Sequence, residues 1–169
     1  MESLEIILGL AGIDLDEKQK RAFAQEKNAR YLRWVETLRP SDTLPGVVSY
    51  LRELKKAHKF VALASASQNA RRVIGLLKVD RLFDAVIDGS MIERTKPDPE
   101  IFIKAAQALA LPPERCVVFE DAKNGIEAAK AAGMVAVGIG LPENLGFADC
   151  VIRDFSPVNI EILKRRGIA

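Results

Sequence analysis

The stretch CVVFEDAKNGIEAAKAAGM, residues 116–134, decides the fold class of this chain. Its apolar start is typical of a strand buried on both faces, and an alanine-rich helix is expected over residues 122–132. Between them lie two adjacent carboxylates, Glu120 and Asp121. Neighbouring carboxylates beside a buried strand repel each other and lose hydration, so the pair predicts a bound cation.

Outward from this stretch, apolar strands and helices alternate. We expect strands at 60–65, 83–88, 116–120, 134–140 and 150–153, and helices at 47–56, 70–77, 100–110, 122–132 and 158–165. Strands that are apolar throughout and are separated by helices predict a parallel sheet with helices on both faces. The fold class is therefore α/β and Rossmann-like.

A helical appendage precedes this alternation. Its second helix is expected from about residue 16 to residue 38, because Phe23, Tyr31 and Trp34 recur at helical spacing. The segment RPSDTLPG then breaks the pattern with two prolines and a glycine. We therefore place a partial helical unit at residues 1–40 and the Rossmann-like core at residues 41–169.

Composition excludes several classes of protein. The net charge is only +2 over 169 residues, which gives no basis for expecting a nucleic-acid partner. The longest apolar runs are too short to span a bilayer, and no signal peptide is visible, so we expect no membrane partner. Both cysteines, Cys116 and Cys150, lie in apolar runs without metal-ligand spacing, and buried thiols in a reducing cytoplasm are expected.

In an open parallel sheet, ligands bind beyond the carboxyl ends of the strands. The strand at 60–65 ends at Ser65, and a helix begins shortly after Ser67 and Asn69. Free backbone N–H groups at such a helix start suit a phosphate, and the Ser65 hydroxyl adds a donor. The alternative is that Ser65 or Ser67 only caps the helix.

Lys96 follows the second strand and directly precedes Pro97, which restrains it to an extended conformation. A lysine there can neutralise a transferring phosphoryl group, although a solvated surface lysine is the alternative. Glu120 and Asp121 suit Mg2+, which takes one or two protein carboxylates and completes its shell with phosphate and water. The alternative is Asp121 as a helix N-cap with Glu120 exposed.

Three segments resemble motifs of the haloacid dehalogenase-like phosphotransferase superfamily. They are ALASAS, TKPDPEIF and VFEDAKNGIEAAKAAGM, which are similar to its second, third and fourth motifs. Within the superfamily, the SAS doublet with Asn69, the KPxPxIF form around Lys96 and the segment GLPENLG near Pro142 are similar to the β-phosphoglucomutases. The resemblance covers nearly the whole chain.

The resemblance implies a role for each matching residue. Ser65 and Lys96 would be catalytic and hold the transferring phosphoryl group, with help from the Ala66 backbone. Asp121 would bind Mg2+ directly, and Glu120 would bind it or lie just behind. The substrate's other phosphate would contact Ser67 and Asn69, and the sugar would contact Lys27 and Asn28 of the segment EKNARY. Gln68 stands where the mutases often carry lysine, which weakens the second phosphate contact.

The implied reaction is Mg2+-dependent interconversion of β-glucose 1-phosphate and glucose 6-phosphate through an aspartyl-phosphate. One alternative is a sugar-phosphate phosphatase, in which water accepts the phosphoryl group. Another is a non-catalytic, phosphate-binding remnant. A receiver-type module shares the parallel sheet but does not predict the order of these residues.

The family's first motif, Asp-x-Asp-Gly after an apolar strand, supplies its nucleophile and its acid/base. The nearest match is Asp14-Leu15-Asp16, which is followed by Glu17 and preceded by a helical pattern. Asp16 is better interpreted as the N-cap of the next helix. We therefore expect the front of the family pattern, with its first strand, to be absent and the chain to be inactive. Self-association through the strands left open is then possible.

Overall fold

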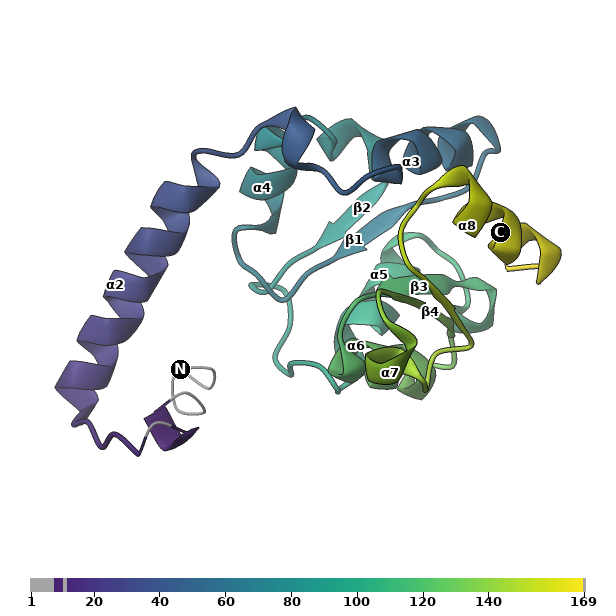
Figure 1. Ribbon diagram of the computed structural model, residues 1–169. Helices are drawn as coiled ribbons and strands as arrows, with labels where there is room; N and C mark the ends of the chain where they lie inside the picture. Colours follow the sequence, from purple (N-terminus) through teal and green to yellow (C-terminus); the bar gives the residue numbers. More distant parts are fainter. Residues whose placement is uncertain (1–7, 11, 169) are drawn as a thin grey trace. The chain divides into compact units, whose positions relative to one another are not determined.

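The computed structural model describes residues 8–10 and 12–168, with the side chains of residues 158 and 159 excepted. The chain divides into two units, residues 1–38 and residues 39–169 (Figure 1). The boundary that we place after residue 40 falls two residues further along the chain. No helix in the described part of the chain is long and apolar enough to cross a membrane.

The main element of the first unit is helix α2, Glu17–Val35. Its N-terminus carries a reciprocal capping box: Asp16 Oδ1 accepts from the Gln19 N–H at 2.7 Å, and Gln19 Oε1 accepts from the Asp16 N–H at 3.0 Å. Residues 13–16 form no strand. The N-cap role expected for Asp16 is confirmed.

The second unit alternates strands and helices as the sequence predicts. Its strands are β1 Ala62–Ala64, β2 Ala85–Ile87, β3 Val117–Glu120, β4 Val135–Ile139 and β5 Cys150–Ile152. Its helices are α3 Val47–Lys56, α4 Ala70–Leu76, α5 Glu100–Ala108, α6 Lys123–Ala131, α7 Pro142–Leu145 and α8 Pro157–Arg165, with short 3-10 turns at Pro40–Asp42, Asp80–Leu82 and Pro113–Arg115. Each expected strand and helix of this unit is confirmed to within two residues, whereas α7 and the 3-10 turns were not predicted.

All strand pairs are parallel, which confirms the α/β class. They form two separate ladders in the described chain, β1–β2 and β3–β4–β5, and β1 does not pair with β3. Figure 1 shows β1 and β3 as the strands on the facing sides of the two ladders. The strand layer is thus interrupted between β1, which is followed by Ser65, and β3, which ends at Glu120.

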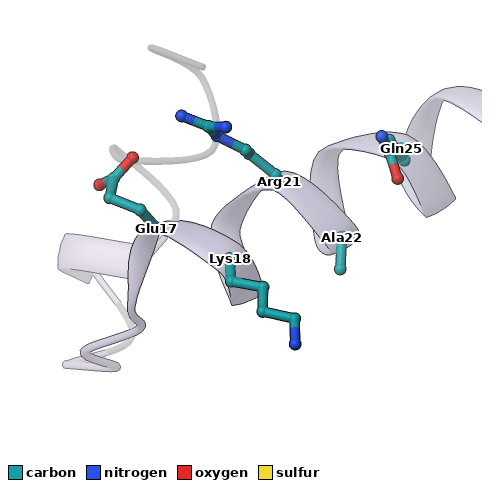
Figure 2. Close-up of a pocket in the computed structure, with 5 residues that line it drawn as sticks. All are labelled: Glu17, Lys18, Arg21, Ala22 and Gln25. Atoms are coloured by element: carbon teal, nitrogen blue, oxygen red, sulfur yellow. The ribbon is translucent and has the colours of Figure 1, made fainter.

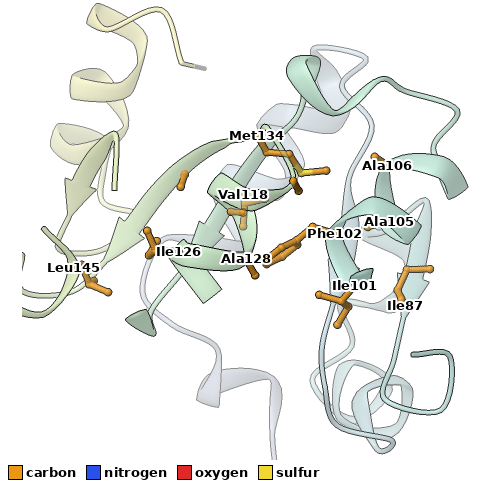
Figure 3. Close-up of a cluster of buried hydrophobic side chains, with 13 residues drawn as sticks. Ile87, Ile101, Phe102, Ala105, Ala106, Val118, Ile126, Ala128, Met134 and Leu145 are labelled. Carbon is orange, nitrogen blue, oxygen red and sulfur yellow. The ribbon is translucent and has the colours of Figure 1, made fainter. Parts of the chain in front are cut away.

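Helices cover both faces of this layer. Helices α5 and α6 pack on one face, where Ile101 and Ile126 are almost completely buried in a cluster that also includes Ile87 of β2 and Val118 of β3 (Figure 3). Full burial of one such side chain contributes about 1.5–3 kcal/mol. This shared cluster joins the two ladders into one unit.

The other face carries a second core, which α3 and α8 share with β3, β4 and β5. At its centre the rings of Tyr50, Phe119 and Phe155 contact one another, with centroids 5.5–5.8 Å apart. Burial raises the pKa of the Tyr50 hydroxyl. Because Val118 and Phe119 point to opposite faces, β3 has to be apolar on both sides.

Two aspartates anchor the outer strands. Asp84, just before β2, accepts from the Val61 N–H at 2.8 Å, and Asp149, just before β5, accepts from the Ala136 N–H at 2.8 Å. A bond from the Lys55 ammonium lowers the pKa of Asp84, and the Ala136 N–H lowers the pKa of Asp149. Each carboxylate therefore fixes the register of an outer strand against its inner neighbour.

Candidate functional site

The loop after β1 is organised by its own hydroxyl groups. The Ser65 N–H donates to the Ile87 carbonyl at 3.0 Å, which extends the β1–β2 ladder by one bond. Ser65 Oγ accepts from the Ser67 N–H, and Ser67 Oγ accepts from the Asn69 N–H, both at 3.2 Å. The serines do shape the turn, as the alternative interpretation expects. Each hydroxyl hydrogen can still donate, because these bonds use only oxygen lone pairs.

Gly89 fixes this loop from the side of β2. Its N–H donates to the Ser67 carbonyl at 3.3 Å, and a Cβ at this position would lie 2.1 Å from the Ala66 carbonyl oxygen. A side chain at residue 89 would therefore displace the Ala66 backbone. The sequence analysis did not identify this role, although the glycine directly after the strand FDAVID was a visible signal.

Lys96 and Glu120 meet although 24 residues separate them in sequence. Lys96 Nζ lies 2.5 Å from Glu120 Oε2, and the two side chains are only 18% and 10% exposed. The ammonium also lies 4.8 Å from the centroid of the Phe102 ring. The alternative of a solvated surface lysine is wrong, because Lys96 is paired and largely withdrawn from water.

Gly125 makes room for the carboxylate of this pair. A Cβ at residue 125 would lie 2.0 Å from Glu120 Cδ. The glycine lies in the first turn of α6, where it costs about 1 kcal/mol of helix stability relative to alanine. A glycine inside an alanine-rich helix was a signal that the sequence analysis did not use.

Glu100 holds the loop that carries Lys96. Its carboxylate accepts from the Arg94 N–H at 2.8 Å and the Glu93 N–H at 3.2 Å, and it pairs with Lys104 at 2.6 Å. The Lys104 bond, followed by the Arg94 N–H, lowers the pKa of Glu100 to about 2. The backbone just before Lys96 is thus fixed by a carboxylate that the sequence analysis did not single out.

Asp88 is a buried carboxylate at the end of β2, with 6% of its surface exposed. It accepts from the Ser90 N–H at 3.0 Å, from the Ser90 hydroxyl at 2.6 Å and from Arg71 Nε at 3.3 Å. The Ser90 bonds lower its pKa. These contacts assign Asp88 to the turn after β2 rather than to a reacting group.

The carboxylates after β3 differ in their surroundings. Asp121 is exposed, whereas Glu120 accepts from Lys96 and, at 3.3 Å, from the Ala122 N–H. The N-cap of α6 is Ala122, so Asp121 does not hold the capping position of the alternative interpretation.

Among the described residues, no three His, Cys, Asp or Glu side chains gather as metal ligands. Since Mg2+ needs only one or two protein carboxylates, Asp121 fits as a ligand, and Glu120 fits better as the partner of Lys96.

The predicted sugar contacts belong to the first unit. Lys27 and Asn28 lie on α2, and both are exposed. Figure 2 shows a surface hollow on the same helix, lined by Glu17, Lys18, Arg21, Ala22 and Gln25. Neither the predicted sugar contacts nor any strand-end residue lines it, so the hollow supports no assignment. The role of Lys27 and Asn28 stays a prediction.

A family model, related sequences and a solved structure all match this chain over most of its length. The family model of the haloacid dehalogenase-like hydrolases matches residues 3–133. A β-phosphoglucomutase of Bacillus subtilis is 38% identical over 164 residues, which are 96% of this chain and 73% of that protein. A phosphorylated carbohydrates phosphatase of Thermotoga maritima is 34% identical over 79% of this chain and 57% of its own length. The crystal structure of a β-phosphoglucomutase from Clostridium difficile matches 98% of this chain and 75% of its own, with TM-score 0.89 and 34% identity.

Proposed function

The chain belongs to the haloacid dehalogenase-like hydrolase family, and we propose that it serves the Mg2+-dependent interconversion of β-glucose 1-phosphate and glucose 6-phosphate. The observation that carries the proposal is the buried Lys96–Glu120 pair, which holds the Lys96 ammonium at the carboxyl ends of the strands. A positive charge at this place is what the transfer of a phosphoryl group needs. The similarity to β-phosphoglucomutases over nearly the whole chain favours the mutase reaction.

In the proposed site, Lys96 neutralises the transferring phosphoryl group as a fixed positive charge. The Ser65 hydroxyl and the Ala66 N–H donate to its oxygens. Asp121 would hold Mg2+, whose chemistry is to screen the phosphate charge during transfer. The substrate's other phosphate contacts Ser67 and Asn69.

We propose that the first unit acts as a partial helical cap. In this proposal Lys27 and Asn28 of α2 contact the sugar. A cytoplasmic setting is part of the proposal. It is supported by the free thiols of Cys116 and Cys150, which form no disulfide.

A sugar-phosphate phosphatase is the second candidate, favoured by the similarity to the Thermotoga maritima phosphatase. The two reactions differ in the group that accepts the phosphoryl group. With β-glucose 1-phosphate, a mutase yields glucose 6-phosphate, whereas a phosphatase releases inorganic phosphate. If the chain turns the substrate over, measuring both products in one reaction decides between them.

We also propose that residues 1–169 by themselves bind the phosphorylated sugar without turning it over. Asp16 is engaged as a helix cap, and no described strand ends in the family's Asp-x-Asp-Gly pattern. Turnover that survives Asp14→Asn and Asp16→Asn but disappears in Lys96→Ala would contradict the proposal that this chain alone is inactive. The same result would leave the proposed phosphate site unaffected.

Binding tests the site independently of turnover. Calorimetric titration with β-glucose 1-phosphate and Mg2+ should give saturable binding that Lys96→Ala weakens roughly tenfold or more, equivalent to about 1.4 kcal/mol. Lys56→Ala is the matched control, because Lys56 is exposed at the end of α3. Equal affinity of the two variants would place the phosphate elsewhere and overturn the proposal.

A further inference from the structure

The Lys96 ammonium lies over the ring of Phe102, with 4.8 Å between Lys96 Nζ and the ring centroid. A cation at this distance is attracted to the negative face of an aromatic ring. Phe102 belongs to the first turn of α5, the helix that follows Lys96 in the chain. One loop and the helix after it therefore supply both the charge and the ring.

This contact is largely withdrawn from water. Phe102 is buried and projects from α5 into the cluster that includes Ile101 and Val118 (Figure 3), and most of the Lys96 side chain is covered. A contact between a cation and a ring is stronger when water is excluded from it. The attraction between Lys96 and Phe102 is therefore expected to lie toward the strong end of its range.

A similar contact on the surface of the protein shows the difference. Lys123 Nζ lies 5.5 Å from the centroid of the Phe147 ring, but both of these side chains are exposed. Water competes for the Lys123 ammonium, so this contact is expected to be weak. The Lys96 contact is the one that lies at the proposed phosphate site.

The Lys96 ammonium has three N–H donors and no acceptor. Glu120 Oε2, at 2.5 Å from Lys96 Nζ, is the one hydrogen-bond acceptor that the described residues give it. The Phe102 ring attracts the charge but is itself neutral, so it does not cancel the charge as a second carboxylate would. An N–H donor and much of the positive charge are therefore left for an anion.

We propose that Phe102 is a positioning residue for Lys96, whose ring holds the ammonium in place before a phosphate oxygen arrives. The lysine stem is flexible, and ordering it upon binding would reduce affinity. Glu120 restrains the ammonium through one hydrogen bond, and the ring adds a second restraint. This role rests on the proposed function in one respect, because it takes the ligand of Lys96 to be a phosphate group.

Core packing is the competing explanation for Phe102, because a buried phenylalanine also fills space. The two explanations require different properties of the ring. Packing depends on its volume and shape, whereas attraction of a cation depends on the negative potential of its face. Fluorine atoms on the ring weaken this potential and change the shape little, so they separate the two explanations.

The test replaces Phe102 in the full chain by phenylalanines that carry one, two or three ring fluorines, and inorganic phosphate is titrated into each protein by calorimetry. The dissociation constant should rise stepwise with the number of fluorines, to roughly three to ten times its original value with three. Phe155, a buried phenylalanine of the other core, is the matched control. The same replacements at Phe155 should leave the affinity unchanged.

A second measurement needs no phosphate. Nitrogen NMR relaxation at Lys96 Nζ reports how well the ammonium is ordered in the ligand-free protein, and this order should fall with each fluorine on Phe102. Lys104 is the internal control, because its ammonium pairs with Glu100 at 2.6 Å and its order should not change.

If the order of Lys96 and the affinity for phosphate both stay constant across the Phe102 series, the ring only fills the core and the proposal is wrong. A change in only one of the two quantities would also overturn it, because ordering of the ammonium and phosphate binding would then not be linked. If the unmodified protein itself does not bind phosphate, the proposed function fails. The order of Lys96 across the series then decides by itself whether the ring holds the ammonium.

Discussion

Lys96 Nζ and Glu120 Oε2 lie 2.5 Å apart in a largely buried ion pair at the carboxyl ends of the strands. The pair joins the loop before α5 to the last residue of β3, and so links the two ladders at the proposed phosphate site. Because breaking a buried pair leaves an uncompensated charge, either partner is more sensitive to substitution than a surface residue.

Glu120→Gln should lower the free energy of unfolding by about 1–3 kcal/mol, because Lys96 loses its charged acceptor. Inorganic phosphate should bind more tightly to the same variant, because one negative charge beside its site is gone. Urea titration and calorimetry measure the two effects. Glu53→Gln, on the exposed side of α3, should change neither quantity. Weaker phosphate binding by Glu120→Gln would mean that Glu120 positions Lys96 more than it neutralises it.

Gly125→Ala should destabilise the protein by about 1–3 kcal/mol, because the added methyl group would overlap the Glu120 carboxylate. Gly75→Ala provides the opposite control. Gly75 lies inside α4, and apart from its chain neighbours and the backbone of its own helix no atom lies within 4 Å of the place that its added methyl group would take, so alanine should stabilise the helix by about 0.5–1 kcal/mol. Thermal unfolding of both variants measures the difference. A neutral Gly125→Ala would show that Glu120 can move without cost.

Stability should fall in acid through Glu100. Its folded pKa of about 2 lies below the ordinary value of 4.5, so its contribution is fully present above about pH 4.5 and is lost as pH falls toward 2. The lowered pKa values of Asp84 and Asp149 add loss in the same direction. Urea midpoints between about pH 6 and pH 2.5 measure the decline. Glu100→Gln should show a shallower decline than Glu114→Gln, an exposed control, and identical profiles would refute the assignment.

Asp121→Asn should lower the affinity for Mg2+ in the presence of β-glucose 1-phosphate roughly tenfold or more, since a neutral amide replaces the proposed carboxylate ligand. Glu143→Gln, which removes an exposed charge from α7, should leave the affinity unchanged. Isothermal titration with MgCl2 compares the two. A Glu120→Gln variant that loses Mg2+ while Asp121→Asn retains it would reverse the roles given to these carboxylates.

Local sequence determined much of this protein. The apolar strands followed by helices predict the parallel α/β architecture, because a strand buried on both faces has to be apolar throughout. Asp16 and Gln19 mark the start of α2, since a capping box depends on residues three positions apart. The order of Ser65, Lys96 and the carboxylates after β3 is also visible without coordinates.

Only the tertiary structure decided the pairing of Lys96 with Glu120, the methyl-sized space that Gly125 leaves for it, and the division of the strands into two ladders. Each depends on groups brought together from distant parts of the chain. Local periodicity reports which face of an element is apolar, but it contains no information on which neighbour that face or edge will meet.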